Sequence, residues 1–228
     1  MLGRARLLML GAAIAAAPAT AAGPFAVDLG GMRIVLDAPA GFADTAFTGS
    51  PRVQELAESL TSASNRVLLF AISDGDLRRF MGGDTPDFRR YMLATTPKVL
   101  ERTAVSSGDF AQLAADLLRE AGPAAPDANF MKYLDQPPYG QPRLLAELRR
   151  EREVVAILQG TRMPADPEHP DEKPQYMLFS TTLVWMRGKA LALSVYTRLD
   201  DPADMAWIRY TTTRWTADLQ RLNNSRSR

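Results

Sequence analysis

His169 is the only histidine in the chain, and it lies among carboxylates in the segment DPEHPDE (166–172). Carboxylate oxygens suit hard cations, and an imidazole suits a borderline metal. The candidate metal ligands are therefore Asp166, Glu168 and His169. The segment lacks the spacing of an EF-hand and the paired histidines of HExxH, and prolines on both sides of His169 limit how these side chains can converge. The simpler interpretation is a hydrated acidic loop, and we expect neither a metal nor another cofactor.

Other catalytic patterns are missing from the sequence. A serine hydrolase would need His169 as its base, but no Gly-x-Ser-x-Gly turn presents a serine. The absence of cysteine removes thiolate catalysis, disulfides and cysteine-bound metals. The 26 acidic residues offer many carboxylate pairs, but no spacing distinguishes one pair for acid–base catalysis. The Gly-Gly pairs at 30–31 and 82–83 are typical of turns, because they lack the flanks of a phosphate-binding loop.

The segment 122–142 contains five prolines and three aromatic residues, Phe130, Tyr133 and Tyr139. A long irregular segment in a compact domain is often either functional or mobile. These three residues are the candidates for binding a ligand between this segment and the sheet. The alternative is that the segment packs on the domain and its rings extend the edge of the core.

A predicted hairpin and helix between residues 175 and 222 must position any such site. The runs 176–186 and 190–197 are rich in β-branched, aromatic and aliphatic residues, and Gly188 can supply the positive φ of a tight turn. Both runs are largely apolar on both faces, which predicts a hairpin at the centre of a sheet covered on both sides. Asp201 and Pro202 suit the start of a helix. One face of that helix should cover the sheet. Its residues recur at spacings of three and four: Met205, Ile208, Thr212, Trp215, Leu219 and Leu222.

The preceding chain alternates between strand-like and helix-like segments. We expect a hairpin over 25–36, strands over 66–72 and 91–95, and helices over 51–60, 73–82 and 108–119. In the second of these helices, Leu77, Phe80 and Met81 should face inward. Ser107 is the expected cap of the third helix.

The segment 144–163 supports two interpretations. Its charged centre favours a helix by propensity, whereas its alternation of apolar residues favours two strands. We expect a hairpin with a charged, solvated turn near Arg150 and Glu151. The segments together predict an α+β domain, with a central and mainly antiparallel sheet covered by helices on both faces.

The order of features over 175–222 is similar to PsbP-like domains. The features are an apolar strand, an Arg-Gly-Lys turn, a second strand, the segment DPAD (201–204) and a helix with Trp207 and Trp215. The resemblance is looser over 25–120. It implies an α/β/α sandwich, and members of that fold are mostly non-catalytic accessory or binding proteins, including photosystem subunits and a Ran-binding factor. None of their functional residues can be placed here, because a fold does not transfer a function. The chain also resembles exported bacterial proteins without an assigned role.

Residues 1–22 have the pattern of a cleaved signal peptide, with Arg4 and Arg6 before an apolar stretch and small residues before Gly23. The apolar stretch has eleven residues, fewer than the roughly 20 of an ordinary membrane span. An uncleaved anchor helix is the alternative. Cleavage leaves residues 23–228 as a single α/β domain, with 25 basic and 26 acidic side chains. This balance gives no argument for binding nucleic acid or an anionic membrane.

Two classes of function remain open from the sequence. The first is a periplasmic or secreted accessory protein that binds an envelope protein without catalysis. The second is a periplasmic small-ligand-binding protein or an enzyme, with a site under the segment 122–142. The missing catalytic motifs and the resemblance favour the first class. We expect no nucleic-acid partner and no membrane span in the mature form.

The exported form should begin at Ala22 or Gly23, because the small residues before Gly23 suit a signal peptidase. N-terminal sequencing of protein from the cell envelope checks this prediction. Full-length chain recovered only from the cytoplasm would show that residues 1–22 do not direct export.

Overall fold

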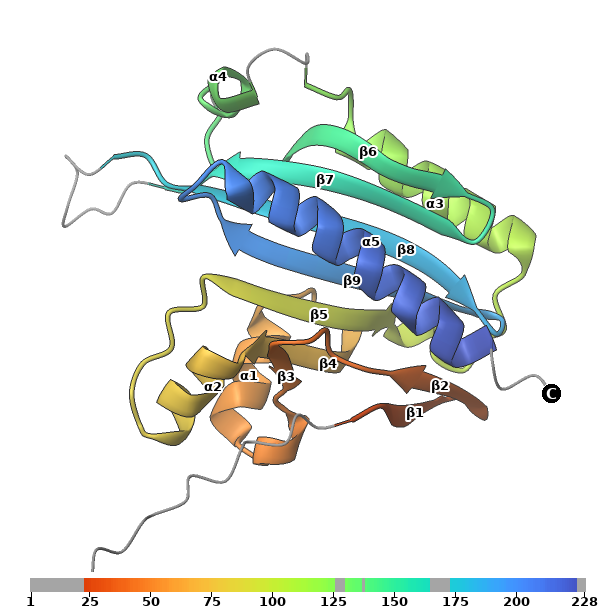
Figure 1. Ribbon diagram of the computed structural model, residues 1–228. Helices are drawn as coiled ribbons and strands as arrows, with labels where there is room; N and C mark the ends of the chain where they lie inside the picture. The colour runs from red at the N-terminus through yellow and green to blue at the C-terminus, as the bar shows by residue number, and fades with distance from the viewer. Residues whose placement is uncertain (1–22, 126–129, 137, 165–172, 225–228) are drawn as a thin grey trace, which may run out of the picture.

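The structure of the protein is a computed structural model, and it describes residues 23–125, 130–136, 138–164 and 173–224. The expected signal peptide lies outside the described residues, as do Asp166, Glu168 and His169. The described residues form an α+β fold, with one large sheet between helices (Figure 1). This agrees with the fold class that the sequence predicts.

The predicted elements occur in the expected order along the chain. The strands are β1 (Phe25–Leu29), β2 (Met32–Leu36), β3 (Phe42–Asp44), β4 (Asn65–Ser73), β5 (Arg90–Pro97), β6 (Arg143–Glu151), β7 (Val154–Arg162), β8 (Tyr176–Met186) and β9 (Lys189–Arg198). The helices are α1 (Pro51–Ser59), α2 (Asp74–Met81), α3 (Ser107–Ala121), α4 (Phe130–Leu134) and α5 (Ala203–Asn224), with 3-10 turns η1 (Ala46–Thr48) and η2 (Lys98–Leu100). Of these elements, β3, α4 and the two 3-10 turns were not predicted. β1 and β2 form a separate hairpin. The other strands form a seven-stranded antiparallel sheet in the order β3-β4-β5-β9-β8-β7-β6.

The β8–β9 hairpin lies in the middle of this sheet, as predicted. Its strands pair from Met177 opposite Arg198 to Met186 opposite Lys189. The turn consists of two residues with positive φ, Arg187 at 53° and Gly188 at 74°. Two consecutive residues with positive φ form a type I′ turn, whose twist matches that of the paired strands.

Helix α5 covers one face of the sheet (Figure 1). It begins as predicted, because the Asp201 carboxylate accepts a hydrogen bond of 2.7 Å from the Ala203 N–H. Trp215 is 2% exposed, and its indole N–H donates to the Asp37 carbonyl oxygen at 2.8 Å. The buried residues of the predicted stripe are Ile208, Thr212, Trp215 and Leu219.

The last turn of α5 is fixed to β2 by a buried side chain. The Asn223 amide accepts a hydrogen bond from the Val35 N–H and donates one to the Val35 carbonyl, both at 2.9 Å. A neighbouring strand would satisfy the same two backbone groups. One side chain therefore joins the β1–β2 hairpin to the helix.

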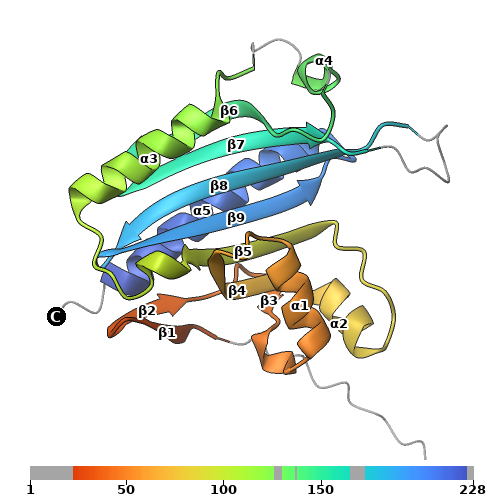
Figure 2. The same ribbon diagram turned by 180° about the vertical axis from the view of Figure 1, so that it is seen from behind.

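The opposite face carries helices only toward its two sides (Figure 2). α1 and α2 pack on β4, where Val53 and Ala57 join an apolar cluster with Phe70. α3 packs on β7 and β8, and the rings of Phe110 and Trp185 lie 6.4 Å apart. Helices thus lie on both faces, but the second face remains open between them.

Met81 was expected to face inward, but it is 64% exposed. It is the last residue of α2, and only Leu77 and Phe80 of the three expected residues pack against the apolar cluster beside β4. The cap of α3 also differs from the prediction. Ser106, and not Ser107, exchanges hydrogen bonds with Asp109 in a capping box, which satisfies two free amides.

The hairpin interpretation of the segment 144–163 is confirmed, because β6 and β7 pair along it. The turn lies at Arg152 and Glu153, two residues later than expected. β6 has two irregularities of register, and these shift the pairing so that Glu151 lies opposite Val154. Within the part of the chain that the structure describes, no helix is both long enough and apolar enough to cross a bilayer.

Replacing Trp215 with alanine should remove about 3–5 kcal/mol of the free energy of unfolding, because it leaves a cavity between α5 and the sheet. Arg214→Ala is the matched control, since its side chain is 62% exposed and pairs only along the helix surface. That change should cost no more than about 0.5 kcal/mol. Urea denaturation of both variants measures the difference. An unchanged midpoint for Trp215→Ala would contradict the packing of α5.

Candidate functional site: an open aromatic face of the sheet

A row of side chains crosses four strands on the face opposite α5. Tyr91 of β5 lies opposite Tyr196 of β9, Tyr196 lies opposite Phe179 of β8, and Phe179 lies opposite Gln159 of β7. Residues that oppose one another in a sheet point to the same face. All four side chains are partly exposed, although they lie near the centre of the sheet.

The rings in this row stack on one another. The ring centroids of Tyr91 and Tyr196 are 4.5 Å apart at an interplanar angle of 11°, and those of Phe179 and Tyr196 are 5.7 Å apart at 20°. Tyr91 also meets Phe70 edge to face at 6.3 Å. Such contacts fix the orientation of the rings, so the row presents a firm apolar surface.

The adjacent row along the same strands is smaller and more polar. Ser194 of β9 and Thr181 of β8 lie opposite each other, and both are partly exposed. On their far side, Leu183 and Trp185 are covered by α3. The open face therefore has aromatic rings on one side and the small hydroxyl side chains of Ser194 and Thr181 at its centre.

The helices on this face have their main contacts at its two sides. α1 and α2 lie over β4, and α3 lies over β7 and β8 (Figure 2). In the sheet order, three to four strand spacings of about 4.8 Å separate these positions, or roughly 14–19 Å. Tyr91 and Tyr196 also pack against the apolar cluster that includes Val53 and Phe70, so the row is partly covered at its β5 end.

The aromatic row carries no charge near neutral pH. Burial raises the pKa of the hydroxyl groups of Tyr91 and Tyr196, and for Tyr91 the neighbouring Tyr196 acts in the same direction. Both phenols therefore stay protonated. Aromatic rings without charge are typical of the centre of protein interfaces.

A buried carboxylate fixes the row to the start of α5. Asp204 is 1% exposed and binds the guanidinium groups of Arg89 at 2.9 Å and Arg90 at 2.6 Å. It also accepts hydrogen bonds from the backbone N–H groups of Asp200 and Asp201. Arg89 and Arg90 directly precede Tyr91. These ion pairs therefore hold the start of β5, and with it Tyr91, next to the start of α5.

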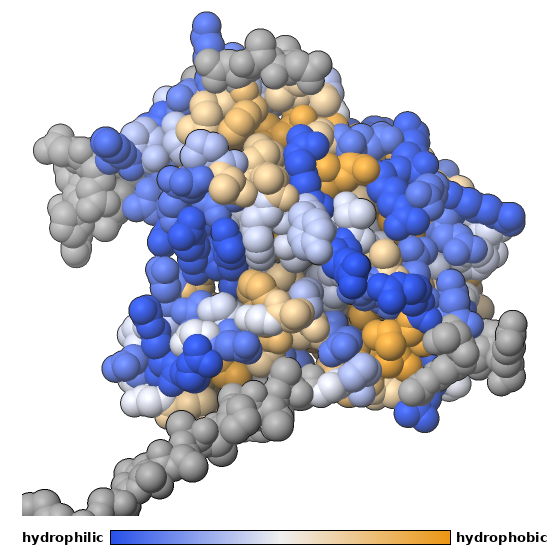
Figure 3. All heavy atoms as spheres, viewed as in Figure 1, coloured by the Kyte–Doolittle hydropathy of each residue, from blue (hydrophilic) through white to orange (hydrophobic). Residues whose placement is uncertain are grey.

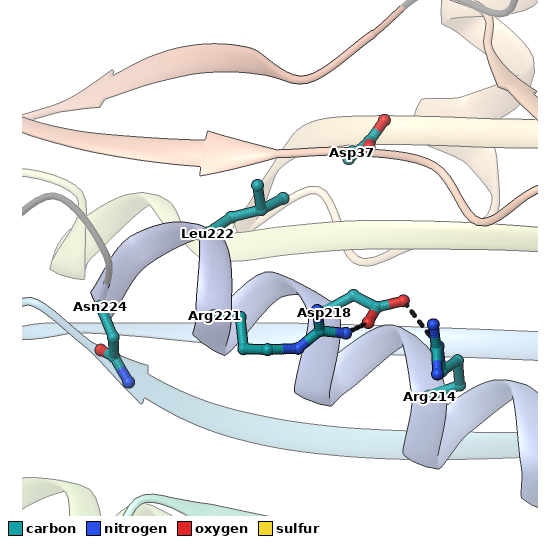
Figure 4. Close-up of a pocket in the computed structure, with 6 residues that line it drawn as sticks. All are labelled: Asp37, Arg214, Asp218, Arg221, Leu222 and Asn224. Carbon is teal, nitrogen blue, oxygen red and sulfur yellow. Dashed lines mark hydrogen bonds and ion pairs between the residues drawn. The ribbon is translucent and has the colours of Figure 1, made fainter.

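The surface on the α5 side is different. Figure 3 shows hydrophilic residues along much of α5, with apolar surface near α4 and near the β1–β2 hairpin. A broad hollow of about 790 Å³ lies along the end of α5. Its charged groups pair along the helix, since Asp218 binds Arg214 at 3.1 Å and also binds Arg221. Figure 4 shows Asp37 and Asn224 pointing away from the two ion pairs of Asp218. The polar groups drawn there therefore do not converge on one point in the hollow where a ligand could bind.

Two smaller hollows lie on the other side of the molecule. One of about 620 Å³ lies between α1 and β4, and one of about 380 Å³ lies between α3 and the turn of β6 and β7. Neither includes the aromatic residues predicted to bind a ligand.

The aromatic candidates of the segment 122–142 lie near α4 and contact different partners. Arg143 lies over the Tyr133 ring at 4.9 Å, and Arg162 lies over the Tyr139 ring at 4.4 Å. Phe130 begins α4 and is partly exposed. The three rings line none of the hollows described above, and a ligand site beneath this segment stays a prediction.

Among the residues that the structure describes, no group of three or more acidic or histidine side chains could hold a metal ion. The candidates Asp166, Glu168 and His169 lie outside those residues, so their interpretation as a hydrated loop stays a prediction. The open face, in contrast, was not predicted from the sequence.

Comparison with models of protein families finds no match, and comparison with curated protein sequences finds none. Solved structures similar to this chain include a mutant of the protein Mog1 and the Ran-binding protein Mog1p of Saccharomyces cerevisiae. Each is 14% identical with a TM-score of 0.38. The alignments cover 88% and 87% of this chain, and 94% and 93% of the other chains, respectively.

The Asp204 cluster predicts a loss of stability in acid. Burial is the largest single influence and opposes ionisation, but hydrogen bonds from Arg90, the Asp201 and Asp200 amides and Arg89 lower the pKa of Asp204 from 3.8 to about 2. A carboxyl with a lowered pKa stabilises the fold above its unfolded pKa, and this stabilisation disappears as the pH falls through the folded value. The contribution is roughly 2 kcal/mol at neutral pH.

Asp204→Asn should therefore destabilise the protein at pH 7 and flatten the fall in stability between about pH 4 and pH 2. Asp218→Asn is the control, because Asp218 is more exposed and pairs only along the helix. Urea denaturation across this pH range measures both effects. Parallel stability curves for Asp204→Asn and the parent would show that the cluster does not act in this way.

Proposed function

We propose that the protein is an exported, non-catalytic accessory protein that binds another protein through the open face of its sheet. The observation that carries the proposal is the stacked, partly exposed row of Tyr91, Tyr196 and Phe179 on the face of the sheet opposite α5. Aromatic residues are enriched among those that dominate binding energy in protein interfaces.

In this proposal the partner presents an amphipathic helix. The apolar stripe of such a helix would lie on Tyr196 and Phe179, and its flank would meet Thr181 and Ser194. The sheet already accepts a helix on its other face, where Ser180 hydrogen-bonds to Thr212 of α5 at 2.6 Å. A partner helix would thus repeat, between two molecules, the helix-on-sheet packing present within this one.

The place of action in this proposal is the cell envelope. The signal-peptide pattern of residues 1–22 supports export, and the partner is accordingly an envelope protein. The order of elements supports a PsbP-like sandwich, a fold whose members are mostly accessory or binding proteins. Fold likeness alone assigns no role, so the proposal rests on the open face.

Photo-crosslinking in intact cells tests the proposal directly. A photoreactive phenylalanine analogue placed at position 179 should give one adduct of defined mass, identified by mass spectrometry. The same analogue at position 210 is the matched control, because Tyr210 is 68% exposed on the outer side of α5. If a partner binds the open face, the analogue at position 179 should form this adduct, and the analogue at position 210 should form no adduct of the same mass.

A second substitution shows whether docking on the face is required. Thr181→Arg adds bulk and charge at the centre of the face, and it should lower the yield of the adduct at 179 at least tenfold. Thr213→Arg makes the same change on the exposed surface of α5 and should leave the yield unchanged. Equal yields from positions 179 and 210, or an adduct insensitive to Thr181→Arg, would overturn the proposal.

A further inference from the structure

The most exposed large apolar side chain among the described residues is Val99, which is 80% exposed. It lies in the 3-10 turn η2, at the start of the loop 98–105 that joins β5 to α3. Lys98 precedes it and Arg102 follows it, and both are exposed. A single apolar residue on a surface identifies no site. The basic residues around Val99 are what distinguish it from other exposed apolar residues.

Two turns of the fold adjoin this loop. The β8–β9 turn contacts it, because the Val105 N–H donates to the Gly188 carbonyl at 2.8 Å. The β1–β2 turn contacts it as well, since a Cβ added to Gly30 would lie only 2.7 Å from the Arg102 Cα. Both views of the molecule show these turns at the end of the sheet where α3 begins and α5 ends (Figures 1 and 2). The loop and the turns therefore form one end of the molecule.

The loop is held firmly although it is exposed. The buried Lys189 ammonium donates to the carbonyl oxygens of Glu101 and Thr103, at 3.0 and 2.9 Å. At the start of the loop, the Lys98 N–H donates to the Ser64 carbonyl at 2.9 Å. The exposed valine is thus presented in a fixed position. A surface that is fixed in advance loses less entropy when it binds.

Basic residues outnumber acidic ones at this end of the molecule. The count covers the segments 28–33, 98–105 and 187–189 and the neighbouring Arg66. The basic residues are Arg33, Arg66, Lys98, Arg102, Arg187 and Lys189, and the acidic residues are Asp28 and Glu101.

The acidic side chains near the loop are bound or balanced by other groups. Arg66 forms an ion pair with Glu101. Asp28 lies opposite Arg33 in the β1–β2 hairpin. Acids on the adjoining elements have neighbours of their own: Asp109 in the capping box of α3, Glu58 with a hydrogen bond from Gln54, and Glu153 beside Arg152. The excess positive charge therefore lies on the remaining exposed bases.

These bases are Lys98, Arg102 and Arg187, and all three are exposed. None of them forms an ion pair within the part of the chain that the structure describes. The Lys98 ammonium donates to the Ala63 carbonyl at 2.8 Å and has two further donors. Phosphate groups suit such a set, because a guanidinium binds phosphate through two parallel hydrogen bonds and an ammonium binds it as a point charge.

We propose that this end of the protein binds a membrane surface that contains anionic phospholipids. Val99 enters the boundary between headgroups and acyl chains, and Lys98, Arg102 and Arg187 contact phosphate groups around it. Lysine is depleted in protein interfaces, whereas at a lipid surface an apolar residue enters the bilayer and its basic neighbours stay among the headgroups. This combination favours lipid over an acidic protein. The surface is separate from the open face and does not depend on the partner proposed above.

The overall charge of the chain does not reveal such a surface. Attraction to a charged membrane depends on where the basic residues lie, and it acts within about one Debye length. The near balance of acids and bases in the whole chain is therefore compatible with a basic end.

Sedimentation of the mature protein with lipid vesicles tests the proposal. Vesicles of phosphatidylglycerol and phosphatidylcholine in equal parts should bind it at low salt, and vesicles of phosphatidylcholine alone should not. Arg102→Gln and Arg187→Gln should each weaken binding about fivefold, which corresponds to about 1 kcal/mol for each basic residue near the surface. Arg209→Gln is the matched control and should change nothing, because Arg209 is exposed on α5, away from this end.

A fluorescent label at position 99 shows whether this residue enters the lipid. Because the chain has no cysteine, Val99→Cys gives a single site for a label whose emission depends on solvent polarity. The emission should shift to shorter wavelength on the mixed vesicles and stay unchanged on phosphatidylcholine. The same label after Met81→Cys is the control and should not shift, since Met81 is 64% exposed on α2, at the other end of the sheet (Figure 1).

Several results would overturn the proposal. They are the absence of binding to the mixed vesicles, equal binding to both kinds of vesicle, an equal loss with Arg209→Gln and Arg187→Gln, or an unchanged emission at position 99. Poly-glutamate tests for an acidic protein as the partner. If it binds and the mixed vesicles do not shift the emission, the surface binds acidic proteins and the lipid proposal is wrong. Thr181→Arg should leave vesicle binding intact, which separates this surface from the open face.

Discussion

The packing of α5 against β8 and β9 is the constraint on which the rest of the structure depends. Trp215 fills the space between helix and sheet, and its indole N–H satisfies a backbone carbonyl beside β2. Asn223 and Asp204 fix the two ends of the helix to β2 and to the start of β5. Because this helix occupies one whole face of the central hairpin, any partner that contacts the hairpin must approach its other face.

The two faces of the hairpin therefore serve different purposes. The face under α5 is closed and supplies stability, whereas the other keeps large rings partly exposed between two groups of helices. In our proposal these rings contact the partner, because apolar side chains that lie together on a surface are typical of interaction sites. The stacking of Tyr91, Tyr196 and Phe179 fixes their orientation before any partner arrives, which lowers the entropy lost on binding.

Local patterns predicted the central hairpin, the α5 stripe and the β6–β7 hairpin, because each depends on spacing within a short stretch. The open face depends on which strands become neighbours, and residues 98–188 separate β5 from β9 in the chain. Phe179 and Tyr196 alternate with their neighbours along the strands just as core residues do. No local signal in the sequence therefore distinguishes them from core residues. Ser106 and Ser107 are equally good caps by type, and only the position of Asp109 decides between them.

Hydroxyl-radical footprinting of the mature protein tests the central claim about the open face most directly. The oxidation rates of Phe179 and Tyr196 would be measured by mass spectrometry in the purified protein and in intact envelopes. If the face binds a partner, both rates should fall in the envelope, while that of exposed Tyr210 on α5 stays unchanged. Unchanged rates at Phe179 and Tyr196, together with protection of Tyr210, would contradict the account.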